Sequence, residues 1–204
     1  MARWEPDARG RLEQAAMDLF VERGYAHTTV GDIAERAELT ERTFFRYFSD
    51  KREVLFSGSK VLEDTLVDVI TRAPKDVPAF EVVANAFEVA GAELQSRRDF
   101  SYVRARYAIV TEHAEVQERE LIKLASLAAA ITKALLARGV TQPAASLVAE
   151  AGIAAFKIGF DRWVNAQKPG ELATHIRAAV DVLKIVTATA PQASRTQRVS
   201  TKSK

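Results

Sequence analysis

The chain has 204 residues, of which 48% are hydrophobic and 27% are charged, and its formal net charge at pH 7 is +2. This length gives one or two domains with a sizeable core, and so balanced a charge does not by itself indicate a nucleic-acid partner. The absence of cysteine excludes disulfides, thiolate catalysis and Cys-ligated metal. The histidines His27, His113 and His175 lie far apart in the chain, so we expect neither a metal site nor a cofactor.

The N-terminal sequence and the lengths of the apolar runs predict the location of the protein in the cell. The first stretch, MARWEPDARG, is charged where the apolar part of a signal peptide would lie. No apolar run approaches the roughly 18 residues that a membrane-spanning helix needs. We therefore expect a cytoplasmic protein that has no contact with a membrane.

Apolar residues recur at intervals of three and four along most of the chain, which predicts an all-α fold. A first helix is expected from about Asp7 to Arg23, because an apolar stripe fills this segment and Gly24 supplies a stop signal. The residues of the stripe are Leu12, Ala15, Ala16, Leu19 and Phe20.

The next stretch has the pattern of two short helices joined by a tight turn. Helices are expected over residues 29–37 and 40–48. Thr29 and Asp32 have the spacing of a capping box, and Thr40 can cap the second helix. This arrangement is typical of a helix-turn-helix.

The second of these helices would bury Phe44 and Phe48 and turn polar and cationic groups outward, as a reader of the major groove requires. Arginine can bond to guanine O6 and N7, glutamate can accept from cytosine N4, and threonine can contact phosphate or a thymine methyl. The alternative is that these groups form an ordinary solvated face. The outward residues are Glu41, Arg42, Thr43, Arg46 and Tyr47.

The segment from about Arg9 to Phe56 resembles the DNA-binding domain of the TetR family of bacterial transcriptional regulators. The resemblance rests on the runs LFVERGYAHTTVGDIAERA and TFFRYFSDKREVL. It implies an all-helical homodimer that represses transcription from an operator and releases the DNA when a small molecule binds its larger C-terminal domain. Glu38 stands where the family usually has glycine, so the turn must close in another way. Phe45 replaces a frequent tyrosine, so a phosphate contact is missing.

On this resemblance the chain divides into a helix-turn-helix domain at 1–50, a ligand-binding and dimerisation domain at 51–189, and a disordered basic tail at 190–204. One helix over 51–71 would link the two domains, with Lys51 at its start contacting a DNA phosphate. The expected DNA-binding residues are Thr29, Thr40, Glu41, Arg42, Thr43, Phe45, Arg46, Tyr47 and Lys51.

Further helices are expected over 79–96, from Phe100 onward, and over 115–137, 143–167 and 170–189. The last two helices are rich in small and apolar residues, and the resemblance makes them the dimer interface. The alternative is that both apolar stripes are satisfied within one subunit. The expected interface residues are Ala151, Ala155, Gly159, Leu172, Ile176, Val180 and Leu183.

The resemblance also implies a site between the middle helices, where apolar walls and a few polar groups would hold a small hydrophobic effector. Ordinary core packing is the alternative for the phenylalanines. The candidate residues are Phe87, Tyr102, Arg106, Tyr107, His113, Phe156, Phe160 and Trp163.

Three classes of function compete. We expect a dimeric, ligand-responsive repressor that binds a palindromic operator. A protein-interaction module whose helix-turn-helix no longer binds DNA is the alternative, favoured by Glu41 and by the slight excess of acids in the first domain. We expect no enzymatic activity, because no nucleophile lies at a usable spacing from a base and there is no phosphate-binding glycine loop or metal set.

Overall fold

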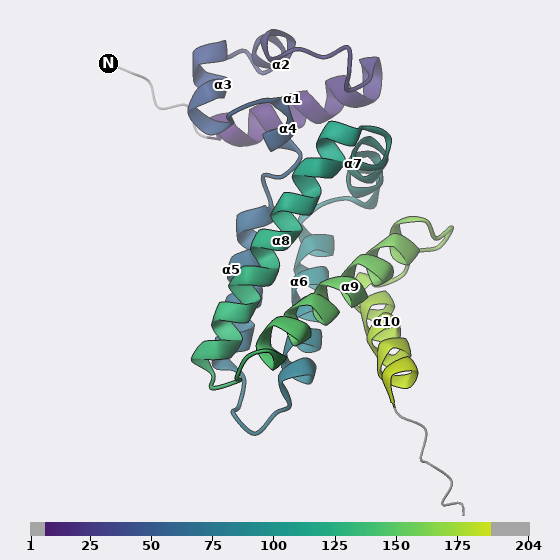
Figure 1. The fold of residues 1–204 in the computed structure, drawn as a ribbon. Helices are drawn as coiled ribbons and strands as arrows, with labels where there is room; N and C mark the ends of the chain where they lie inside the picture. The colour runs from purple at the N-terminus through teal and green to yellow at the C-terminus, as the bar shows by residue number, and fades with distance from the viewer. Residues whose placement is uncertain (1–6, 189–204) are drawn as a thin grey trace, which may run out of the picture.

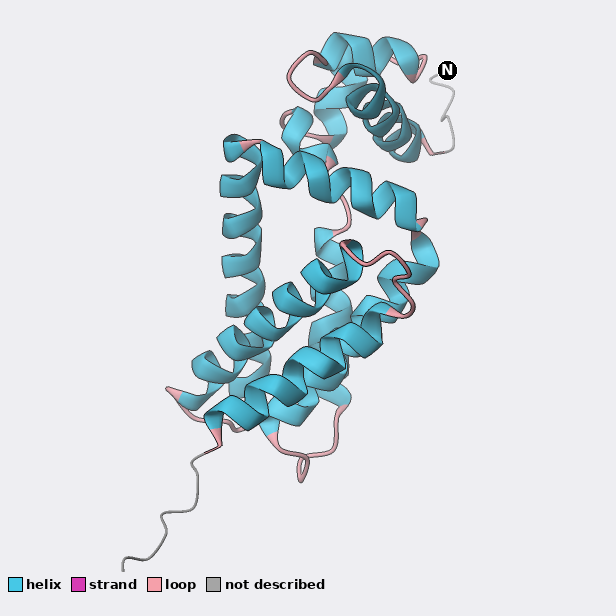
Figure 2. Ribbon diagram, turned by 90° about the vertical axis from the view of Figure 1, so that its right-hand side faces the viewer, coloured by secondary structure: helices cyan, strands magenta, loops and turns pink. Residues whose placement is uncertain are grey.

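The computed structural model describes residues 7–188, and every regular element in that range is an α-helix (Figures 1 and 2). This finding confirms the all-α prediction. Within the described range no helix is both long enough and apolar enough to cross a membrane. The basic tail expected at 190–204 lies outside the described residues. The helices are α1 (Ala8–Arg23), α2 (Val30–Arg36), α3 (Glu41–Tyr47), α4 (Lys51–Val54), α5 (Ser59–Arg72), α6 (Ala79–Arg97), α7 (Phe100–Glu112), α8 (Ala114–Ala137), α9 (Ala144–Val164) and α10 (Leu172–Thr187).

Helices α1 to α4 form a small unit at one end of the molecule, which we call the head (residues 7–57). Its core contains the apolar stripe of α1 and the inner faces of α2 and α3. Leu12, Phe20, Ile33, Phe44 and Phe48 are all buried there. Because Phe44 and Phe48 fill one face of α3, the opposite face of that helix is left toward solvent.

The single helix expected over 51–71 is wrong, because the chain turns between α4 and α5. Val54, Leu55 and Phe56 follow one another in sequence and are all buried in the core of the head. Residues 55–58 form a turn instead of a further turn of helix, and Leu55 and Phe56 within this turn contribute to the core of the head. The core of the head therefore extends beyond residue 50.

Helices α5, α6, α8, α9 and α10 form the body of the molecule (residues 59–188, together with α7), around a second core. Helix α10 packs against both α9 and α6, and α8 packs against α5 and α9. Helix α7 lies directly beneath the head, at the boundary between the two cores (Figure 1). The body thus meets the head mainly through α7 and the start of α8.

Most of the residues expected in a dimer interface are used inside a single chain. The five fully buried ones pack α10 against α9 and α6, where small residues allow a close approach, so these side chains are not available to a second copy. Ala151 and Leu183 are half-buried. The buried residues are Ala155, Gly159, Leu172, Ile176 and Val180.

Gly159→Ala tests this close approach. A Cβ atom on Gly159 would lie 2.7 Å from the Cα of Ile176 and 2.9 Å from the carbonyl oxygen of His175. Because both are backbone atoms, α10 must shift, and we expect the free energy of unfolding to fall by about 1–3 kcal/mol. Urea denaturation followed by circular dichroism measures the change.

Gly58→Ala is the matched control, because its added Cβ would meet no atom within 4 Å and its φ is −81°. This variant should keep the stability of the parent chain to within about 0.5 kcal/mol. Equal effects of the two substitutions would contradict the close packing of α9 on α10.

Candidate nucleic-acid interface

The two short helices of the head are held by their capping threonines. The Thr29 hydroxyl accepts from the Asp32 amide at 3.1 Å, and the Asp32 carboxylate accepts from the Thr29 amide at 2.8 Å. The Thr29 hydroxyl also donates to the Asp32 carboxylate at 2.6 Å, and this bond together with that from the Thr29 amide holds the pKa of Asp32 below its usual value. Thr40 accepts from the Thr43 amide at 3.2 Å in the same way, and the two hydroxyls lie 3.1 Å apart. The capping predicted from sequence is therefore present at both helices.

Arg11 closes the turn that lacks a glycine. Glu38 adopts a left-handed backbone with φ of 54°, a conformation that costs a residue with a Cβ about 1–2 kcal/mol. The Arg11 guanidinium from α1 donates to the carbonyl oxygen of Ala37 and lies 3.4 Å from the Glu38 carboxylate. The sequence showed that the turn needed a partner, but the spacing of 27 residues gave no means to identify it.

The outer face of α3 presents a compact set of side chains to solvent. The side chains of Glu41 and Arg42 are exposed, and neither side chain forms a hydrogen bond or ion pair within residues 7–188. The Arg46 guanidinium lies over the Tyr47 ring at 4.9 Å and donates to its hydroxyl at 3.3 Å. Phe45 is 54% exposed, which is unusual for a phenyl ring. This face therefore carries unpaired charged side chains, a guanidinium stacked on an aromatic ring, and an exposed phenyl ring.

Lys51 is half-buried at the edge of the head, and its ammonium bonds to the backbone of the head. Its ammonium donates to the carbonyl oxygens of Tyr25 and Thr28 at 2.8 and 3.0 Å, and it lies 4.3 Å from the centre of the Tyr25 ring. Burial lowers the pKa of this ammonium. Lys51 thus ties the start of α4 to the loop between α1 and α2, a role that the expected phosphate contact did not anticipate.

Five of the expected effector residues form one continuous line of rings, which we call the aromatic row. The Phe87 and Phe156 rings stack at 5.0 Å, and the contacts continue from Phe156 through Phe160 to Trp163 at 5.8 Å each. Tyr107 reaches Phe160 at 6.1 Å. Phe100 was not among the expected effector residues, yet its ring contacts that of Trp163 edge-on, with 5.0 Å between the ring centres.

The other three expected effector residues lie at the boundary with the head. Arg106 donates to the carbonyl oxygen of Leu55 at 2.7 Å, and the His113 ring lies 4.8 Å from the Tyr25 ring. Tyr102 packs against both cores. These three residues connect the body to the head instead of lining the aromatic row.

The head of this chain matches a known protein family. Residues 13–57 match the family model of bacterial regulatory proteins, tetR family. The transcriptional regulator TcmR of Streptomyces glaucescens is 34% identical over 79 residues, and HbdR of Aromatoleum sp. (strain CIB) is 30% identical over 118 residues. These matches cover 39% and 57% of this chain, and 35% and 50% of those regulators.

The match to a solved structure extends over both head and body. Thermus thermophilus FadR, a TetR-family transcriptional repressor whose structure contains lauroyl-CoA, is 26% identical with a TM-score of 0.55. The superposition covers 90% of this chain and 97% of that one. The likeness therefore includes the arrangement of the body helices as well as the helix-turn-helix.

Lys51→Met separates the two roles considered for Lys51. Methionine keeps the apolar stem but leaves the carbonyl oxygens of Tyr25 and Thr28 without their charged donor. We expect the free energy of unfolding to fall by about 1–3 kcal/mol in urea denaturation. Lys60→Met is the control, because Lys60 pairs with Glu63 and Asp64 on the surface and its loss should barely move the unfolding curve. If the Lys51→Met variant keeps its stability but its DNA binding depends less steeply on salt, Lys51 contacts a DNA phosphate as the sequence predicted.

Proposed function

We propose that the chain is a transcriptional repressor of the TetR family of bacterial regulatory proteins and that it binds a palindromic operator as a homodimer. A small hydrophobic ligand bound in the body releases it from the DNA. The observation that carries this proposal is the outer face of α3, where Glu41 and Arg42 are exposed and without partners within the described chain.

The proposed base contacts follow from the chemistry of that face. Arg42 lies near the start of α3, where it can reach guanine, and Glu41 can accept from cytosine N4. The exposed ring of Phe45 can pack on a thymine methyl, a contact that needs no hydroxyl. Arg46 and Tyr47 form a stacked pair that can reach the flanking phosphates. Thr29, Thr40 and Thr43 act indirectly by holding α2 and α3.

We propose that two copies meet through the outer apolar face of α9 and α10, and not through the buried residues expected from sequence. Large apolar side chains remain exposed along this face at helical spacing, and exposed apolar patches of this kind mark interaction sites. A two-fold axis through the face would pair α9 and α10 with their copies and set two heads on one DNA duplex. The exposed residues are Leu147, Ile158, Val182, Ile185 and Val186.

We propose the aromatic row as the effector site. Its Phe156 and Phe160 rings are only half-buried and lie beside Tyr107, whose hydroxyl donates to Asp161. An apolar ligand can insert among these rings and meet a polar group at one end. The lauroyl-CoA in the structure of Thermus thermophilus FadR supports a ligand with a large apolar part.

Selection of bound sequences from random DNA, followed by footprinting at two salt concentrations, tests the function directly. A repressor of this kind should yield a palindrome with half-sites about one helical turn apart, near 34–36 Å, or somewhat more, and bind it less tightly at high salt. Failure to enrich any sequence would support the protein-interaction alternative.

Arg42→Ala tests the reading face. Loss of a bidentate contact with guanine should weaken binding to the selected operator by about 5- to 150-fold, and it should relax the preference at one base pair in each half-site. Arg36→Ala is the control, because Arg36 is bonded to Glu22 of α1 at 2.8 and 3.0 Å. Gel shifts on operator and random DNA measure both. An equal loss of affinity for operator and random DNA would mean that Arg42 contacts a phosphate and does not read a base.

Ile185→Asp tests the dimer. Ile185 is 74% exposed in the single chain, and a carboxylate there would be buried without a partner in the proposed interface. We expect sedimentation to show a shift from dimer to monomer. Val21→Asp on α1 is the control, because Val21 is 66% exposed but lies far from α10 in the fold. A dimer that survives Ile185→Asp would refute this face as the interface.

A further inference from the structure

Helix α7 is shared between the two cores of the molecule. Its Val103 is buried in the core of the body, whereas Ile109 and Val110 are buried in the core of the head. Tyr102 packs against both. A rigid helix that contributes to two cores cannot move relative to one without disturbing the other.

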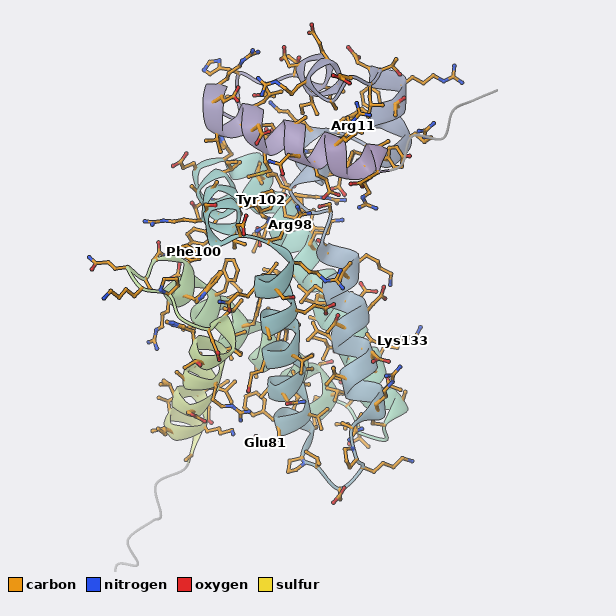
Figure 3. All side chains as sticks on the ribbon, turned by 180° about the vertical axis from the view of Figure 1, so that it is seen from behind. Arg11, Glu81, Arg98, Phe100, Tyr102 and Lys133 are labelled. Carbon is orange, nitrogen blue, oxygen red and sulfur yellow. The ribbon has the colours of Figure 1, made fainter. Side chains whose placement is uncertain are left out.

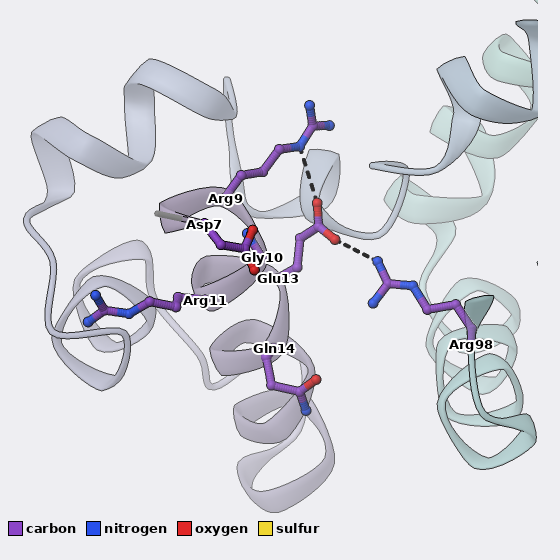
Figure 4. Close-up of a pocket in the computed structure, with 7 residues that line it drawn as sticks. All are labelled: Asp7, Arg9, Gly10, Arg11, Glu13, Gln14 and Arg98. Carbon is purple, nitrogen blue, oxygen red and sulfur yellow. Dashed lines mark hydrogen bonds and ion pairs between the residues drawn. The ribbon is translucent and has the colours of Figure 1, made fainter. Parts of the chain in front are cut away.

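A buried carboxylate ties the head to the corner at which α7 begins. Glu13 of α1 is only 7% exposed, and its two oxygens accept from Arg9 at 3.2 Å and from Arg98 at 2.6 Å (Figure 4). Arg98 ends α6 immediately before α7, and its guanidinium lies over the Tyr102 ring at 4.6 Å. Figure 3 shows Arg98 and Tyr102 together beneath α1. The ion pair therefore joins α1 to the α6–α7 corner.

The surroundings of this ion pair leave it room to open. A surface hollow of about 530 Å³ lies beside it, between the first turns of α1 and the α6–α7 corner. Charged and polar groups line the hollow, so Arg98 can leave Glu13 without entering an apolar environment. The lining residues are Asp7, Arg9, Gly10, Arg11, Glu13, Gln14 and Arg98.

A second set of ion pairs joins the head to a different helix of the body, α8. Glu53 of α4 pairs with Arg119 of α8 and with Lys123 of the same helix at 3.2 Å. Burial raises the pKa of Glu53, but the hydrogen bonds from Arg119 and Lys123 outweigh burial and leave the pKa lowered. Loss of the ion pair at α1 would leave the head held by this ion pair at α4 and by the packing of Ile109 and Val110 of α7, about which it could tilt.

The far side of α7 faces the aromatic row. The Tyr107 ring lies 6.1 Å from Phe160, and its hydroxyl donates to Asp161 of α9. One helix thus carries Tyr107 beside the proposed effector site and begins next to Arg98 at the head.

We propose that the Arg98–Glu13 ion pair is a latch that fixes the angle of the head on the body, and that α7 transmits displacement of Tyr107 to this latch. The proposal rests on the proposed function, because it describes how a ligand in the aromatic row would reach the DNA-binding face. When the latch is closed, the two heads of a dimer stand at one spacing. When it is open, each head samples several angles about the contacts that remain at Glu53 and α7.

Spin labels measure the angle directly and need neither DNA nor ligand. Because the chain has no cysteine, Glu35→Cys on α2 and Lys133→Cys on α8 supply its thiols. Both positions are exposed, and neither side chain has a partner within residues 7–188. Labelled chains are mixed with excess unlabelled chain so that each dimer carries one labelled copy, and pulsed electron resonance records the distance distribution.

Arg98→Met and Glu13→Gln should each broaden this distribution, and Arg98→Lys, which keeps the charge, should leave it narrow. Arg97→Met is the matched control, because the neighbouring Arg97 pairs with Glu93 inside α6 and does not touch the head. An unchanged distribution in Arg98→Met, or equal broadening in Arg97→Met, would overturn the latch.

DNA binding supplies a second readout. Arg98→Met should weaken binding to a complete operator by about 5- to 150-fold, the usual range of coupling between sites. Binding to a single half-site should be unchanged, because a loosened head lowers only the effective concentration of the second head. Equal loss on both DNAs would mean that Arg98 acts on the fold of the head and would refute the latch. A parent chain that binds no DNA would refute the proposed function, while the spin labels would still decide the latch.

Discussion

The burial of Val54, Leu55 and Phe56 in the core of the head is the constraint from which the arrangement of the molecule follows. Val54 ends α4, and Leu55 and Phe56 lie in the turn that follows, so the chain changes direction within the core of the head before α5 begins. Because of this turn, no continuous helix carries the head on the body. The orientation of the head depends instead on side-chain contacts made by α7, α8 and Arg98 at the end of α6. They include the contacts of Arg106 with Leu55, of Arg119 with Glu53 and of Arg98 with Glu13.

The contacts that the sequence predicted are those made over short distances along the chain. Thr29 and Thr40 each cap a helix through a residue three positions away, and a single sequence carries that spacing openly. The helices of the body from α6 onward followed from apolar periodicity in the same way, whereas the start of α5 did not. Residue type and spacing were sufficient because both the signal and the contact lie within one turn of helix.

The partners of Lys51, Arg106 and His113 could not be predicted, because each of these residues contacts a partner that lies 23 to 88 positions away in the chain. A cation at the start of a helix is compatible with a phosphate contact or with two carbonyl oxygens, and only the tertiary fold distinguishes them. Helix α10 illustrates the same limit for apolar residues. Ile176 and Ile185 lie on one helix, yet the first is fully buried within the chain and the second is 74% exposed.

The stack of Arg46 on Tyr47 bears on how fast and how tightly the face of α3 can engage a partner. An arginine free in water loses much of its rotational freedom when it is fixed at an interface, at roughly 0.5–1.5 kcal/mol for a side chain of this kind. In this protein the Arg46 guanidinium already lies over the Tyr47 ring, 4.9 Å from its centre, and donates to the Tyr47 hydroxyl. Part of that rotational entropy is therefore already lost when the chain folds, so Arg46 loses less of it on binding a partner.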